Sequence, residues 1–267
     1  MESEYFDWVA DFELPVKLAK TSTPTRWQMG RITKVKVRVH EDYEYGTIRE
    51  ATGVCSAIQI EGPSPGQEAI AKVKLQLSPW DDPTVDAISM EAIREMDNLA
   101  KLTDVHCSST PAFIGRAHCV QGDDLYIPGG YIVFILMERL PGRDLGCFHE
   151  LSLEERDEVR IAFLKALWEF HRHGFDHWDP RRENIMWDNA ARKCYILDLE
   201  DAEDLEIKGM GTDPLYELSA WDLHGKASRP AYDHVDDDPM IPPERKGGWT
   251  FYDREEMLAM LMRRVTQ

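Results

Sequence analysis

Alternation of hydrophobic and polar residues dominates the first half of the chain and predicts β-strands there. In residues 31–39, Val35, Val37 and Val39 alternate with basic residues, which is the two-residue period of a half-buried strand. Residues 53–60 and 68–77 are also β-rich, and residues 61–67 between them are dense in turn formers. Residues 112–120 and 129–139 predict two more strands. The mixed residues 1–28 predict only an irregular or short-helical lead-in.

Two segments instead show the period of a helix. In residues 84–102, hydrophobic positions recur at steps of three and four, and one carboxylate, Glu95, lies within that apolar stripe. Residues 152–155 have the Ser-x-x-Glu pattern of a capping box, which predicts a helix that Gly174 ends. The apolar face of this second helix comprises Val159, Phe163, Ala166, Leu167 and Phe170.

The order of these elements predicts an α+β protein of two lobes. An antiparallel sheet with one helix forms the predicted N-terminal lobe, residues 1–137. The predicted C-terminal lobe, residues 138–267, is smaller and mainly helical, with a short strand at 193–199 and a final helix near 253–265. Strands gathered first and helices afterwards are typical of this fold class.

Charge and composition limit the classes of partner and the compartment that we expect for this protein. The 267 residues include 31 basic and 49 acidic ones, a net charge of −18, which disfavours nucleic acids and anionic membrane surfaces. The longest apolar run, Tyr131 to Met137, is far shorter than the roughly 20 residues of a membrane span. The acidic N-terminus does not resemble a signal peptide, and five scattered cysteines suggest reduced thiols. We therefore expect a cytoplasmic protein.

The richest chemistry lies in residues 177–200. Asp179 is followed by Asn184 five residues later, and Asp198 ends an apolar run 14 residues after that. This spacing suits phosphoryl transfer, in which one carboxylate deprotonates the acceptor while an amide and a second carboxylate hold Mg²⁺. The motifs HWDPRREN (177–184) and ILDLED (196–201), with the hinge-like segment YIVFILMERLPGRDL (131–145), resemble the protein-kinase-like superfamily. The chain is most similar to its aminoglycoside phosphotransferase and choline kinase branch.

The resemblance implies a protein-kinase-like two-lobed fold, and ATP and Mg²⁺ as cofactors. Asp179 would be the catalytic base. Arg181 would either neutralise the transferring phosphoryl group or form a local salt bridge with Glu183 or a downstream acid. The resemblance further implies three groups of residues, which are metal ligands (Asn184, Asp198 and Glu200), a phosphate-binding lysine with its partner (Lys72 and Glu95), and an adenine contact (Met137, Glu138 and Leu140).

Several alternatives stay open. Lys74 lies on the same face of its strand as Lys72 and competes for the phosphate role, and Glu91 competes with Glu95. Residues 41–53 lack a glycine-rich phosphate loop, which favours a second hypothesis, a catalytically inactive protein that binds a ligand or partner. The acidic Glu200 and the Trp178 that precedes Asp179 disfavour a protein kinase.

The acceptor is expected to be a small molecule. Residues 198–238 contain 13 acidic and three basic residues, and such a charge either attracts a cationic amine or amino sugar or forms a solvated surface. Trp221 and Trp249 are candidates for lining its pocket. His177 is expected to pack against the Asp198 segment. His171 and His173 are expected to complement a helix end, with a metal cluster that includes Asp176 and His177 as the less favoured alternative. The oligomeric state stays open.

Overall fold

The computed structural model describes residues 2–19, 24–82, 87–205, 214–224 and 259. The chain divides into two compact units. Unit 1 comprises Met1–Thr103 and Pro111–Arg139, and unit 2 comprises Asp104–Thr110 and Leu140–Gln267. The predicted final helix near 253–265 lies outside the described residues apart from position 259.

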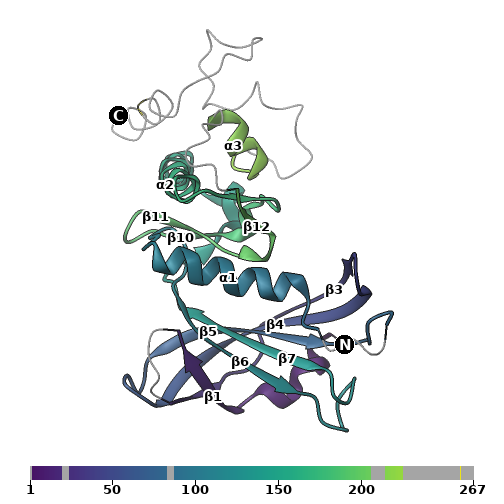
Figure 1. The fold of residues 1–267 in the computed structure, drawn as a ribbon. Coiled ribbons are helices and arrows are strands. Elements are labelled where there is room, and N and C mark those ends of the chain that lie inside the picture. The colour runs from purple at the N-terminus through teal and green to yellow at the C-terminus, as the bar shows by residue number, and fades with distance from the viewer. Residues whose placement is uncertain (1, 20–23, 83–86, 206–213, 225–258, 260–267) are drawn as a thin grey trace. The chain divides into compact units, whose positions relative to one another are not determined.

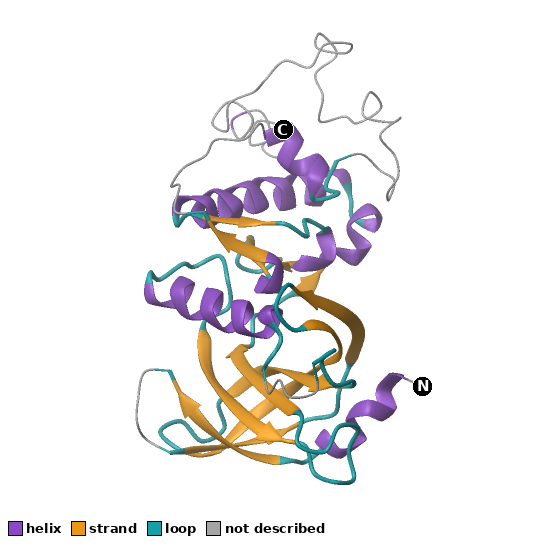
Figure 2. Ribbon diagram, turned by 45° about the vertical axis from the view of Figure 1, so that its right-hand side comes forward, coloured by secondary structure: helices purple, strands orange, loops and turns teal. Residues whose placement is uncertain are grey.

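Unit 1 is built mainly from strands (Figures 1 and 2). A 3-10 helix, η1 (Glu2–Val9), comes first, and one α-helix, α1 (Met90–Asp104), separates the fifth and sixth strands. The strands are β1 (Glu13–Leu18), β2 (Thr25–Met29), β3 (Lys34–Asp42), β4 (Gly46–Glu61), β5 (Glu68–Gln76), β6 (Phe113–Val120) and β7 (Tyr131–Glu138).

Six of these strands close into an antiparallel barrel. The strand order is β2-β1-β6-β7-β5-β4, and β2 pairs with β4 to complete the ring, while β3 extends from β4 outside it. Closure requires close backbone approach where β1 meets β6. A Cβ on Gly115 would lie only 2.6 Å from the carbonyl oxygen of Lys17, so a residue without a side chain is needed there.

The predicted protein-kinase-like two-lobed fold is therefore wrong. Residues 1–28, expected to be a lead-in, supply β1 and β2, and these two strands turn an N-terminal sheet into a closed barrel. The signal was present as alternation, because Leu14 and Val16 are buried in β1, as are Trp27 and Met29 in β2. Pro15 concealed it, since proline within a run argues against a strand.

Strands β5 and β7 of unit 1 are largely buried on both faces. Ala69, Ala71, Val73 and Leu75 of β5 belong to the core inside the barrel, together with alternate residues of β7. The opposite face of β5 carries Lys72 and Lys74, and α1 packs against that face through Glu95. Burial on both faces explains why β7 is an almost continuous apolar run.

Unit 2 combines two α-helices with short strands. Three strands form one antiparallel sheet in the order β11-β10-β8, and β12 pairs with β9. The helices and strands are β8 (Arg143–Asp144), η2 (Leu145–Glu150), α2 (Leu153–Arg172), β9 (Phe175–His177), η3 (Arg182–Asn184), β10 (Ile185–Asp188), β11 (Lys193–Ile196), η4 (Leu199–Asp201), β12 (Ala202–Asp204) and α3 (Pro214–Ala220). The expectation of a mainly helical C-terminal lobe is accordingly wrong for the residues described.

The start and the buried face of α2 were predicted correctly. The Ser152 hydroxyl accepts a hydrogen bond from the Glu155 backbone N–H at 3.1 Å, which satisfies a donor of the first turn. All five predicted face residues of α2 are buried, and Gly174 follows the helix with a φ of 90°.

No helix among the described residues is long and apolar enough to span a bilayer.

Candidate functional site

His177 connects two of the predicted site segments within unit 2. Its Nδ1 accepts a hydrogen bond from the Asp179 backbone N–H at 3.2 Å, and its Nε2 lies 3.0 Å from the Leu197 carbonyl oxygen. An imidazole that accepts at Nδ1 and donates at Nε2 is neutral. Burial accordingly lowers the pKa of His177, despite the raising effects of that carbonyl and of nearby acids. This confirms the expected packing of His177 against the Asp198 segment.

Asn184 joins the same two segments. Its side-chain Nδ2 donates a hydrogen bond to the backbone carbonyl oxygen of Asp179 at 3.1 Å. The backbone carbonyl oxygen of Asn184 accepts a hydrogen bond from the Leu197 backbone N–H at 2.8 Å. Because the Asp179 carbonyl can only accept a hydrogen bond, the side-chain atom of Asn184 that faces it is the amide nitrogen. The amide oxygen, Oδ1, is therefore the side-chain atom suited to a cation. The predicted base and its predicted ligands therefore lie in one part of unit 2.

Asp198 and Glu200 supply the acidic groups. Asp198 follows β11 in the left-handed region, with φ 61° and ψ 55°, a conformation that aspartate adopts more readily than most side chains. A carboxylate oxygen of Asp198 lies within 4.8 Å of one of Glu200, which is buried. Two carboxylates and an amide oxygen are the hard donors that Mg²⁺ prefers, so these residues fit that ion.

Arg181 lies between two of these acids. Its Nη2 forms an ion pair with Asp179 Oδ2 and lies 3.9 Å from Asp198 Oδ2. The sequence had suggested a contact with the phosphoryl group or a salt bridge to Glu183 or a downstream acid, and the pairing with Asp179 itself was missed. In this arrangement the guanidinium balances the charge of the predicted catalytic base and occupies one of its two carboxylate oxygens, Oδ2.

Lys72 of β5 and Glu95 of α1 form an ion pair within unit 1. Lys74 lies 3.9 Å from Glu95 and 3.3 Å from Glu50. The Lys74 side chain is fully buried, whereas that of Lys72 is 12% exposed. Of the two lysines, Lys72 is therefore the one that a ligand can reach, although its predicted contact with phosphates stays a prediction.

Glu50, which sequence reasoning missed, is the centre of a buried polar cluster beside this pair. Burial alone would raise the pKa of Glu50. The charge of the Lys74 ammonium and hydrogen bonds from His40, Ser89 and Tyr131 together outweigh this effect and lower that pKa to about 2. The Tyr131 hydroxyl donates to Glu50 at 2.7 Å and Ser89 does so at 2.6 Å. Partners this distant along the chain leave no local sequence signal.

The other proposed nucleotide contacts are less favourably arranged. The backbone N–H of Glu138 already donates to the Ala112 carbonyl oxygen at 2.8 Å, so it is not available to an adenine ring. Met137 and Glu138 end β7 in unit 1, and Leu140 begins the second part of unit 2. In the hairpin between β3 and β4, the Glu44 and Tyr45 N–H groups donate to the Asp42 carboxylate in place of a phosphate.

The suggested acceptor pocket is only partly described. Trp221 is buried against the rings of Phe163 and His177, as a core residue would be. Trp249 and most of the acidic residues beyond position 205 lie outside the described residues.

The comparisons with known proteins do not identify a family. No protein-family model matches the chain, and no curated protein matches its sequence significantly.

Proposed function

We propose that unit 2 carries a phosphotransferase site that transfers the γ-phosphoryl group of ATP to a hydroxyl of a small molecule, with Mg²⁺ as cofactor. The observation that carries this proposal is the set of hydrogen bonds through His177 and Asn184 that holds Asp179 close to Asp198. Phosphoryl transfer depends mainly on positioning and charge stabilisation, and a rigid arrangement of carboxylates and an amide meets that requirement.

In the proposed reaction, Asp179 orients the acceptor hydroxyl and takes its proton. The hydroxyl oxygen forms a bond to the γ-phosphorus, the bond to the bridging oxygen breaks, and ADP leaves. Asn184, Asp198 and Glu200 would hold Mg²⁺, which neutralises phosphate charge when it is bound. Arg181 would turn from Asp179 toward the transferring group, where a cation stabilises developing charge.

The acceptor we propose is a small cationic molecule, such as an amine or amino sugar. The support is the net negative charge of residues 198–238, 3 − 13 = −10, which would attract such a substrate. We further propose a cytoplasmic location, because all five cysteines are thiols and because the cytoplasm supplies ATP and Mg²⁺.

A second candidate function is binding without catalysis. The ion pair between Arg181 and Asp179 supports it, because it occupies the predicted base. The turn at Asp42–Gly46, which does not offer its N–H groups to a phosphate, supports it as well. This candidate requires a ligand or partner that binds without phosphoryl transfer.

Nucleotide binding is tested by melting the full-length chain with and without Mg²⁺-ATP. A ligand that binds only the folded state at ten times its Kd adds about 1.4 kcal/mol, which raises Tm by a few degrees. We expect this shift in the wild type and in Glu183→Gln, which removes an exposed neighbouring charge, but not in Asp198→Ala. An equal shift in Asp198→Ala would contradict the proposed ligand set.

Turnover separates the two candidates. We expect acceptor-dependent ADP release from the wild type, and a loss of two or more orders of magnitude in Asp179→Asn without loss of nucleotide binding. Binding without turnover across a panel of hydroxylated amines would favour the second candidate. Lys72→Met tests the lysine in the same assay, and unchanged KM for ATP would remove Lys72 from the phosphate role.

A further inference from the structure

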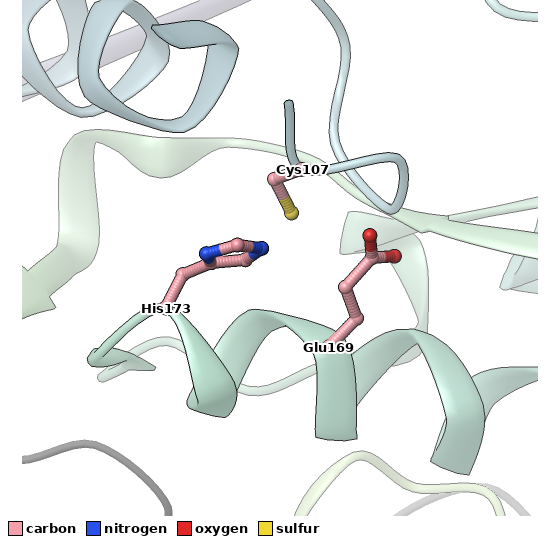
Figure 3. Close-up of side chains that lie close together, drawn as sticks. All are labelled: Cys107, Glu169 and His173. Carbon is pink, nitrogen blue, oxygen red and sulfur yellow. The ribbon is translucent and has the colours of Figure 1, made fainter. Parts of the chain in front are cut away.

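A second group of metal-binding side chains lies elsewhere in unit 2. It consists of Cys107, Glu169 and His173, whose ligand atoms all lie within 4.8 Å of one another. Figure 3 shows the imidazole and the thiol pointing toward one another, with the Glu169 carboxylate on the same side of helix α2. None of these residues takes part in the proposed phosphoryl transfer.

The cluster is held from two parts of the chain. Glu169 lies in the last turn of α2, and His173, four positions later, is the C-cap residue of that helix. The His173 backbone N–H still donates to the Glu169 carbonyl oxygen at 3.3 Å, so the two residues lie on the same side of the helix end. Cys107 belongs to the segment Asp104–Thr110, which is part of unit 2 although both of its chain neighbours belong to unit 1. That segment is fixed against unit 2, because the Ile196 backbone N–H donates to the Ser109 carbonyl oxygen at 2.7 Å.

Serines surround the cluster and orient its ligands. The Ser108 backbone N–H and hydroxyl donate to the two oxygens of Glu169, each at 2.9 Å. The Ser109 side chain also hydrogen-bonds this carboxylate. Because a carboxylate can accept about four hydrogen bonds or ligands, one position remains for an ion. The Ser109 hydroxyl lies 3.3 Å from the Cys107 sulfur. Polar groups that orient the ligands from outside are typical of metal sites.

The donor set indicates which ion would fit. A thiolate, an imidazole and a carboxylate suit zinc, with bond lengths of about 2.0–2.3 Å and tetrahedral geometry. Those bond lengths put neighbouring ligand atoms roughly 3.3–3.7 Å apart, which small side-chain rotations of the present cluster would reach. Mg²⁺ and Ca²⁺ prefer oxygen donors alone. Cys107 is buried while Glu169 and His173 are half-buried, so the ion could enter from the side of the helix.

We propose that Cys107, Glu169 and His173 form a site for Zn²⁺ that clips the segment Asp104–Thr110 to helix α2. Three protein ligands leave a fourth position for water. Binding would release the thiol proton to solvent and would stabilise the folded state, because the unfolded chain does not hold the three ligands together.

Cobalt substitution tests this site on the purified, chelator-treated full-length chain. We expect Co²⁺ to give a thiolate-to-metal charge-transfer band and tetrahedral visible bands, which Zn²⁺ abolishes in competition and excess Mg²⁺ does not. Cys107→Ser should remove the charge-transfer band. Glu169→Gln and His173→Gln should each weaken affinity by about tenfold or more. His173→Gln changes a half-exposed residue at the end of α2 and should leave the fold intact.

Matched controls use the same residue types in unit 2. Cys147→Ser and His149→Gln lie outside the cluster and should leave the spectrum and the affinity unchanged. The proposal is overturned if wild-type protein gives no charge-transfer band at saturating Co²⁺, or if the band survives Cys107→Ser. It is also overturned if the band disappears in Cys147→Ser. A zinc-induced rise in Tm that Cys107→Ser and His173→Gln both lack would support the clip.

Discussion

His40 should make the stability of unit 1 depend on pH in the alkaline range. Its Nε2 lies 3.4 Å from Glu50 Oε1 and its Nδ1 lies 3.2 Å from Glu91 Oε2, and the side chain is only 6% exposed. Burial alone would lower the pKa of His40, but hydrogen bonds to Glu50 and Glu91 and the charges of both carboxylates outweigh it and raise that pKa to about 9. The perturbation we choose is His40→Gln, which keeps a polar side chain and removes the charge.

The magnitude follows from the two pKa values. The difference between 6.5 in the unfolded chain and about 9 in the folded protein corresponds to about 3 kcal/mol, at 1.36 kcal/mol per pKa unit. A raised pKa means that the folded state binds the proton more tightly. The stabilisation is therefore fully present below pH 6.5 and is lost as pH rises through about 9. The lowered pKa of Glu50 includes the same interaction, so it is not added again.

The assay is urea denaturation of the wild type and His40→Gln at pH values between about 6 and 10. We expect the difference in free energy of unfolding to be largest near pH 6 and to shrink by about 1 to 3 kcal/mol toward pH 10. Loss of packing in the variant adds only a constant, so the change with pH is the informative quantity. His118→Gln, at an exposed position of β6, is the control. A difference that does not vary with pH would refute the reasoning.

Three further predictions concern stability. Gly115→Ala should lower the free energy of unfolding by about 1–3 kcal/mol, because its Cβ would press on the Lys17 carbonyl, and an unchanged urea midpoint would contradict that close approach. Ser152→Ala should cost about 1 kcal/mol through the lost helix cap, measured in the same way, while Ser152→Asp should retain the stability. Lys74→Met should cost about 3–5 kcal/mol, because it leaves Glu50 buried without its ammonium partner; a smaller loss by thermal melting would show that other donors suffice.

The individual strands were easier to predict from the sequence than their closure into a barrel. Strands β3 and β5–β7 and helices α1 and α2 follow from local periodicity, which one segment carries by itself. The closure depends instead on β2, whose residues pair with Ala57–Glu61 of β4, more than 25 positions away. Such pairing is non-local, and β2 is a short segment of five residues, so the periodicity that would have revealed it is weak.

The candidate site shows the same division between local and distant information. The spacing from Asp179 to Asn184 is local, and the hydrogen bond between these two residues follows from it. The pairing of Arg181 with Asp179 depends on a side-chain rotamer, which sequence spacing does not specify. The cluster around Cys107 combines a helical i,i+4 pair with a cysteine about 60 residues earlier, and only the folded chain brings those ligands together.

The position of Glu95 in an apolar helix stripe has a structural explanation that does not depend on a nucleotide. Three cationic groups and three carboxylates meet on the outer face of β5 and beside it, so their charges balance once His40 is protonated. These groups are Lys72, Lys74, His40, Glu50, Glu91 and Glu95. A buried charge requires such a partner, because removing one member leaves the other uncompensated. The pairing of Glu95 with Lys72 is thus accounted for by burial alone, and it does not require a nucleotide.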